Sequence, residues 1–208
     1  MKVFKKILFV SCVLFVTQCI IAQSKITHGF NVNGGIGSIQ GIEFLPEGKI
    51  HDILELNGIG SIDYKYNLAL GYKLRLDNKE KPLFYDLDIS LGMKKYEFDY
   101  RVLIEEDGFA SYFGTSGDVS LFYLSLSPTV NYKIYKGLYS GAGMEPTILH
   151  AQGSTMFDVP ITAKIGYNFK FLDVSFGYKH GLLSTVKNKE GFSKGKISEW
   201  SLQFFIPL

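Results

Sequence analysis

Two groups of side chains in this sequence have the types and spacing that acid-base or nucleophilic chemistry requires. The first is a pair of carboxylates, Asp86 and Asp88, two residues apart. In a β-strand that spacing places both on one face, as a general acid-base pair would need. The alternative is a structural role in which they neutralise Lys73 and Arg75 on a neighbouring strand. We favour the structural role, since ion-pair networks mimic active sites.

The second group is centred on His180, with Ser184 four residues later and Glu190 or Glu199 within reach. A histidine, a serine and a carboxylate are the parts of a hydrolytic triad. The alternative is a histidine that simply lies at the rim of the fold, which needs no catalytic reason. The other histidines are scattered over separate segments without metal-ligand spacing: His28, His51 and His150.

These side chains are carried by segments of strict two-residue alternation, which is typical of β-strands. From Ile62 to Leu76 every even position is apolar, and most odd positions are polar or glycine. Further alternation predicts eight strands, at about 26–38, 62–76, 83–93, 120–134, 138–149, 158–170, 172–182 and 197–208. The fold class is therefore all-β, an eight-stranded antiparallel up-and-down barrel.

The glycines indicate which face of the strands is the inside. Eleven glycines fall within the predicted spans, and only Gly34 lies on the apolar face. A narrow barrel needs small residues where side chains crowd toward its axis. The polar face is therefore expected inside and the apolar face outside, in contact with lipid. A soluble ligand-binding barrel would have the opposite orientation.

The connections between the predicted strands alternate in length. Asp77–Pro82, Tyr135–Gly137 and Phe171 make short turns, whereas 39–61, 94–119, 150–157 and 183–196 are longer. Short turns at one rim and long loops at the other are typical of bacterial outer-membrane barrels. This pattern predicts a transmembrane barrel in the cell outer membrane, with extracellular long loops and periplasmic termini.

Two sequence stretches resemble a known family. DVSFGYKHGLLS (173–184) is similar to the aromatic-x-x-Gly-Leu ending of the small PorT-like outer-membrane barrels of Bacteroidota, which share the OmpA/OmpX architecture. EWSLQFFIPL at the C-terminus resembles the signal read by the barrel-assembly machinery, although it ends in Leu208 after Pro207 rather than in an aromatic residue. The resemblance implies an integral outer-membrane protein inserted by that machinery. His180 also resembles the histidine of outer-membrane lipid A deacylases, but their serine lies two residues later, where this chain has Leu182.

The N-terminal 22 residues predict a cleaved secretory signal, because three lysines precede an apolar run and Ala22 offers a cleavage point. Residues 23–208 would then be the barrel domain. Cys12 and Cys19 both lie in the signal, which leaves no cysteine for disulfides, thiolate catalysis or metal binding. Loss of those lysines lowers the net charge from +2 to about −1, which excludes a strongly basic nucleic-acid binder. No cofactor is indicated.

The inward face of the predicted strands carries as many cations as anions. An eight-stranded barrel is just wide enough for side chains to fill, and buried charges must be paired. The predicted interior is therefore a closed salt-bridged plug, and the protein is a structural or interaction protein rather than a porin or an enzyme. The predicted inward charges are Lys65, Lys73, Arg75, Lys133, Lys164, Lys170, Lys179, Asp63, Asp86, Asp88, Glu145, Asp158, Asp173 and Glu199.

Two surface features suggest partners. The apolar set shifts phase at Lys94-Lys95, which suggests a β-bulge, and 95–104 could pair with 58–65 as a projecting hairpin. Its edge would either recruit a protein partner or form a rigid rim covered by its own loops. A last basic loop is expected to contact lipopolysaccharide phosphates through Lys187, Lys189, Lys194 and Lys196.

Overall fold

The structure is a computed structural model that describes residues 25–44, 49–50, 54–78, 80–106, 109–151, 154–184 and 192–208. The predicted signal peptide, residues 1–22, lies outside the described residues. The strands are β1 (Lys25–Phe44), β2 (Lys49–Ile50), β3 (Leu54–Asp77), β4 (Leu83–Glu106), β5 (Phe109–Tyr135), β6 (Leu138–Met144), β7 (Thr147–Ala151), β8 (Ser154–Asp158), β9 (Ile161–Phe169), β10 (Leu172–His180) and β11 (Phe192–Pro207). In the described part of the chain, no helix has the length and apolar character to cross a membrane.

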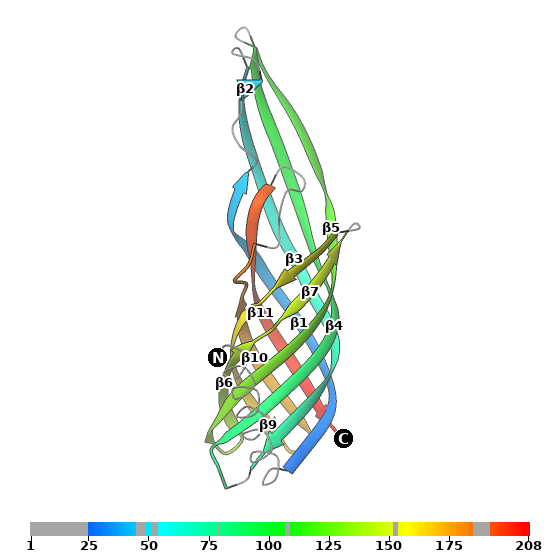
Figure 1. Ribbon diagram of the computed structural model, residues 1–208, viewed down its shortest axis with the longest axis vertical. Coiled ribbons are helices and arrows are strands. Elements are labelled where there is room, and N and C mark those ends of the chain that lie inside the picture. The colour runs from blue at the N-terminus through cyan, green and yellow to red at the C-terminus, as the bar shows by residue number, and fades with distance from the viewer. Residues whose placement is uncertain are drawn as a thin grey trace, which may run out of the picture.

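The strands close into one antiparallel ring (Figure 1). β3, β1, β11, β10, β9, β6 and β5 follow one another, and β4 pairs with both β3 and β5, which completes the circle. β6 and β7 share one place in the ring, because both pair with β5. The predicted all-β, eight-stranded up-and-down barrel is confirmed.

The short turns lie together at one end of the barrel, at the bottom of Figure 1, where β1 begins and β11 ends. One two-residue turn is Lys136-Gly137 between β5 and β6, where both residues have positive φ (38° and 95°). Two successive positive φ values match the right-handed twist of the flanking strands. The predicted turn at 135–137 is therefore confirmed.

The strands differ from the prediction mainly at the opposite, upper end. β1 continues to Phe44, and β3, β4 and β5 extend through most of the segments expected to be loops 39–61 and 94–119. The predicted strand 138–149 divides into β6 and β7, since Pro146 has no N–H for the ladder. β8 forms a hairpin with β7 within the expected loop 150–157.

Side chains in the lower barrel follow the predicted orientation. Along β4, Leu83, Ile89 and Leu91 are exposed on the outer wall, whereas Asp86 and Asp88 are buried in the lumen. Residues 83–93 rise about 3.4 Å each, so at a tilt of about 45° this apolar belt is roughly 25 Å tall. That height matches the apolar band of outer-membrane barrels.

A β-bulge in β3 changes the orientation above this belt. Tyr64 pairs with Tyr96, and Tyr66 pairs with Lys95, so Lys65 is an extra residue opposite the β4 ladder. As a result Tyr64 is buried inside, and Lys65 is exposed outside. The predictions that Lys65 and Asp63 face inward are therefore wrong, because the bulge reverses every side chain beyond it. The predicted bulge in β4 is also wrong, since β4 keeps its alternation past Lys94.

Directly above the bulge, the inner face of the wall is apolar and the outer face is polar. A core cluster on the inner face contains Tyr64, Tyr96, Phe98, Val119 and Leu121, packed with Ile39 of β1 and Ile197 of β11. On the outer face, Lys65 bonds Glu97 and Lys95 bonds Asp118, each at 2.7 Å. The bond to Glu97 raises the pKa of the Lys65 ammonium group. This upper part is organised as a sheet in water.

Candidate functional site

The lumen of the lower barrel contains a network of ion pairs, which we call the lower cluster: Lys73, Arg75, Lys164, Asp86, Asp88 and Asp173. Arg75 bonds Asp86 with Nε and Nη2, at 2.7 and 3.1 Å, and bonds Asp173 with Nη1 at 2.7 Å. Its guanidinium also lies 4.6 Å from the centre of the Phe84 ring. Arg75 thus joins β3 to β4 and β10 across the lumen, using the fixed donor geometry of its side chain.

Two lysines complete the charge balance of the lower cluster. Lys164 bonds Asp86 at 3.1 Å, and Lys73 lies 3.7 Å from Asp88 while donating a hydrogen bond to Gln203. Three cations therefore face three carboxylates. The predicted pairing of Asp86 and Asp88 with Lys73 and Arg75 is confirmed, because both carboxylates contact cations of the neighbouring strand β3.

A second network, the upper cluster, surrounds Glu199: it consists of Lys94, Lys179, Glu145 and Glu199. Glu199 accepts hydrogen bonds from Lys94, Tyr64 and Asn67 at 2.9 Å each. Lys179 lies 2.8 Å from Glu145 and 3.3 Å from Glu199. Two cations again face two anions, so this cluster is also neutral.

Lys94 was missed by the sequence reasoning, which placed it at a break in the alternation. It is 4% exposed and lies on the same inner face as Asp86 and Asp88, so continuing their even-numbered phase past residue 93 would have found it. Lys133 is half-buried at the lower rim, where it bonds Asp77. Lys170 lies exposed in the β9–β10 turn, so its predicted inward position is wrong.

Asp158 is the remaining predicted inward charge, and it is buried as expected. Its Oδ1 accepts hydrogen bonds from the backbone N–H groups of Val159 and Leu183, at 2.8 and 3.1 Å. This carboxylate therefore ties the β8–β9 connection to the segment after β10 rather than to a cation of either cluster.

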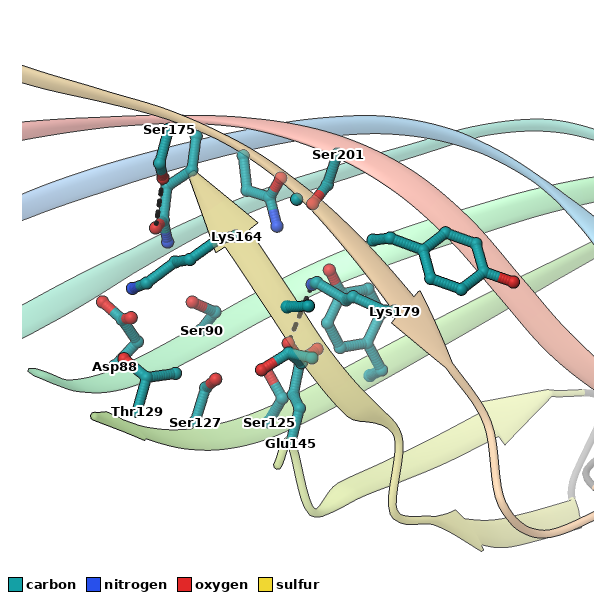
Figure 2. Close-up of a pocket in the computed structure, with 17 residues that line it drawn as sticks. Asp88, Ser90, Ser125, Ser127, Thr129, Glu145, Lys164, Ser175, Lys179 and Ser201 are labelled. Carbon is teal, nitrogen blue, oxygen red and sulfur yellow. Dashed lines mark hydrogen bonds and ion pairs between the residues drawn. The ribbon is translucent and has the colours of Figure 1, made fainter. Parts of the chain in front are cut away.

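A polar cavity of about 40 Å³ lies between the two clusters (Figure 2). Asp88 and Lys164 are at one end, and Glu145 and Lys179 at the other. Asn33, Thr129 and Thr162 line it, and each has a buried side-chain oxygen without a protein partner. A cavity of this size and polarity has room for about three waters. The two clusters separate it from both ends of the barrel, which supports the plug interpretation.

The lower barrel also explains the inward glycines. A Cβ added to Gly92 would lie 2.6 Å from the Tyr123 ring, and one added to Gly71 would collide with the Ser90 hydroxyl and the Ile89 carbonyl. Gly34, the exception on the outer wall, has no such neighbour: its nearest contact would be Leu68 at 3.8 Å.

The predicted hydrolytic group is not assembled as expected. His180 Nδ1 lies 2.9 Å from the hydroxyl of Ser198, its cross-strand neighbour on β11, rather than from Ser184. Ser198 is only 2% exposed, and Glu199 points to the lumen, where cations hold it. Glu190 lies outside the described residues. The structure therefore shows a histidine–serine pair to which no described carboxylate is bonded.

Within the described part of the chain, no three side chains of the metal-binding types come together as a metal site. His28 instead bonds the Tyr72 hydroxyl, and His150 bonds Thr155. His51 lies outside the described residues.

The projecting hairpin is a three-stranded sheet. Residues 95–106 of β4 pair with β3 on one side and with β5 on the other, so the predicted free edge at 95–104 is wrong. In the described residues, the unpaired edges are 56–66 of β3 and 109–121 of β5. We call 54–66, 95–106 and 109–121 the projecting sheet; it rises above the barrel in Figure 1.

Comparisons with solved structures return small bacterial barrels. The attachment invasion locus protein Ail of Yersinia pestis, in complex with the heparin analogue sucrose octasulfate, is 12% identical over 89% of this chain and 99% of its own, with a TM-score of 0.42. The outer-membrane protein OprG of Pseudomonas aeruginosa is 11% identical over 88% and 94%, with a TM-score of 0.40. No protein-family model and no curated protein sequence matches the chain. The likenesses carry no functional argument, and the PorT-like resemblance stays a prediction.

Proposed function

We propose that this protein is an integral outer-membrane barrel with a sealed lumen, which holds the projecting sheet outside the cell as an interaction surface. The observation that carries this proposal is the belt of exposed apolar side chains around a lumen of paired charges. Leu70, Leu91 and Ile36 are each about two-thirds exposed, at 67%, 66% and 65%, while Lys73 is fully buried. Burying charge and exposing hydrocarbon is favourable only where the surrounding solvent is lipid.

The sealed lumen favours a structural or interaction role over diffusion. Both clusters are neutral, and their side chains cross the full width of the barrel between β3, β4, β10 and β11. Solute passage would require breaking buried ion pairs, each of which leaves an unpaired charge in a narrow space.

The projecting sheet is the surface that we propose for a protein partner. Close to the barrel its outer face carries two ion pairs, Lys65–Glu97 and Lys95–Asp118. The unpaired backbone of 56–66 and 109–121 offers two edges for strand addition. During insertion the C-terminal strand, which ends the ring beside β1, would meet the barrel-assembly machinery.

Single cysteines test the membrane placement and the orientation together, because the sequence after residue 22 has no cysteine. We expect Glu97→Cys, in the projecting sheet, to react with a membrane-impermeant maleimide on intact cells. Lys136→Cys, in the tight lower turn, should react only after the outer membrane is opened. Equal labelling of both positions on intact cells, or recovery of the protein in the soluble fraction, would refute the proposal.

Photo-crosslinking tests the interaction role. A photoreactive residue at Ser116, on the β5 edge, should give a discrete cross-linked product in intact cells. The same residue at Phe171, in the lower turn and 76% exposed, is the matched control. The absence of any product both at Ser116 and at Ser61, on the β3 edge, would refute the proposed interaction role without affecting the proposal of a membrane barrel.

A second candidate function, lipid ester hydrolysis, is supported by the His180–Ser198 contact on the outer wall. His180 would act as the general base and the Ser198 oxygen as the nucleophile. Incubation with lipopolysaccharide, followed by mass spectrometry of released acyl chains, tests this activity. Release that Ser198→Ala abolishes and Ser184→Ala retains would establish it; no release from the parent protein would exclude it.

A further inference from the structure

The outer wall contains an apolar groove of about 740 Å³ around Gly34, which we call the outer groove. Gly34 pairs with Leu202 of β11 on one side and with Leu68 of β3 on the other. One step higher on the same face, Ile36 pairs with Trp200. The floor of the groove is therefore backbone, and its walls are large side chains of β1, β3, β10 and β11.

Packing within the chain does not require glycine at position 34. An added Cβ would meet nothing closer than Leu68 Cδ2 at 3.8 Å, in contrast to Gly92, where it would meet the Tyr123 ring at 2.6 Å. A larger outward residue would fit and would fill the hollow. The missing side chain therefore leaves space on the lipid-facing wall that this chain does not use itself.

One wall of the groove is formed by aromatic side chains that contact one another. Phe176 stacks on Trp200 with ring centres 5.3 Å apart and planes at 9°, and Tyr178 also packs against Trp200, with ring centres 4.7 Å apart. Aromatic packing of this kind restricts rotamers and keeps a surface shape. The side of the hollow next to Gly34 is thus bounded by Trp200, whose ring is packed against two other aromatic rings.

The upper end of the groove meets polar and cationic groups. Above Trp200, the outward positions of β11 are Ser198, which His180 covers, and Lys196. Ser38 and Gln40 are exposed opposite them on β1. Lys196 is partly exposed on this face, so its ammonium group places a positive charge at the upper end of the groove.

We propose that the outer groove holds one acyl chain of a phosphate-bearing lipid, with the phosphate at Lys196. The proposal rests on the membrane placement proposed above and adds a specific lipid site to it. The occupant follows from the order of the surfaces: hydrocarbon matches the Gly34 hollow within the apolar belt, and an anionic headgroup matches the lysine above it. Of the four lysines predicted to contact phosphates, Lys187 and Lys189 lie outside the described residues.

Trp200 makes the test direct, because it is the one tryptophan in the sequence and it lines the groove. The protein is reconstituted in phosphatidylcholine vesicles that contain an increasing share of dibrominated phosphatidylglycerol, whose bromines quench a tryptophan in contact. Quenching is normalised to that in fully brominated bilayers. We expect saturation at a low share, with an enrichment at the site of about fivefold from one lysine near an anionic headgroup.

Two substitutions separate the groove from its surroundings. Gly34→Leu should fill the hollow and make quenching follow the bulk share of brominated lipid. Ala163→Leu, at another exposed small residue on the outer wall of β9, is the matched control and should keep the saturable quenching. In the Lys196→Gln variant, dibrominated phosphatidylglycerol should be no more enriched at the groove than dibrominated phosphatidylcholine is.

Each outcome has a distinct meaning. Quenching of the parent protein in proportion to the bulk share would overturn the lipid site while leaving the membrane placement intact. Weak quenching even in fully brominated bilayers would overturn the placement itself. If quenching in fully brominated bilayers falls as protein density rises, a second copy occupies the groove, and the lipid assignment is wrong.

Discussion

The upper cluster gives the sharpest quantitative prediction, because its ion pairs can be removed singly or together. Lys94 and Glu199 are 2.9 Å apart, with side chains 4% and 1% exposed. Lys94→Met leaves Lys179 facing two carboxylates, and Glu199→Gln leaves two lysines facing Glu145. Removing one partner of a buried pair typically costs about 3–5 kcal/mol of unfolding free energy.

The double variant restores balance, since Lys179 and Glu145 remain 2.8 Å apart. Independent effects would add to roughly 6–10 kcal/mol. We expect instead that the double variant costs no more than the worse single variant, which corresponds to a coupling of about 3 kcal/mol or more. The chain's one tryptophan, Trp200, follows Glu199 on the outer wall and reports the transfer from lipid to water on unfolding.

The assay is reversible denaturant unfolding of the refolded protein in lipid or detergent, followed by Trp200 fluorescence. The control is the Lys65–Glu97 pair, whose contact of 2.7 Å is slightly shorter than that of Lys94 and Glu199 but whose side chains are 38% and 48% exposed. Replacing that pair should leave the midpoint unchanged, since solvent screens exposed pairs. Additive losses in the upper cluster, or single losses as small as those of the control, would refute the plug.

Three further predictions concern the wall and the lumen. Deletion of Lys65 should remove the bulge, turn Tyr64 away from Glu199 and lower the unfolding midpoint. Lys65→Ala keeps the extra residue and should leave the midpoint unchanged. Equal effects of the two changes would show that the bulge does not set the side-chain orientation. Gly71→Ala should lower the free energy of unfolding by about 1–3 kcal/mol through overpacking in the lumen. Gly34→Ala should raise it by about 0.5–1 kcal/mol, because the outer wall has room for a Cβ there. Denaturant unfolding measures both, and the reverse order would contradict the assigned faces. The parent protein in planar bilayers should pass no steady ionic current, and sustained openings would contradict a sealed lumen.

The sequence was sufficient for the barrel because period-two alternation is a local property. In 83–93 the apolar residues fell on one face and Asp86 and Asp88 on the other, and the structure confirms both faces. The excess of glycines on the polar face was a second, independent indication, because it follows from crowding in the lumen rather than from hydrophobicity.

The wrong predictions of side-chain orientation lie where the alternation of apolar and polar residues no longer follows the inward and outward alternation of the backbone. On β3 the apolar stripe runs unbroken through Tyr64 and Tyr66, yet the bulge at Lys65 turns the upper part inward. On β4 the geometry is unbroken, and the residue types exchange faces above Lys94. The pattern of residue types alone therefore does not locate a bulge: β3 has a bulge without a shift in the pattern, and β4 has a shift in the pattern without a bulge.

Contacts between strands were also beyond the sequence. The partner of His180 is Ser198, which depends on the register of β10 against β11, and register is fixed by the whole closed ring. The pairing of 95–104 on both sides likewise depends on how far β5 extends.

The exchange of faces above Lys94 has a consequence for where the protein comes to rest. Sinking by two residues along the strands, about 7 Å, would push Lys95 and Glu97 against hydrocarbon, and rising by as much would bring Leu91 and Phe122 into water. Sinking is opposed by the cost of moving charged side chains into hydrocarbon, and rising is opposed by the cost of exposing apolar side chains to water. In the proposed membrane placement the molecule would therefore set its own immersion depth, and a partner bound to the projecting sheet would be held at a fixed height above the membrane.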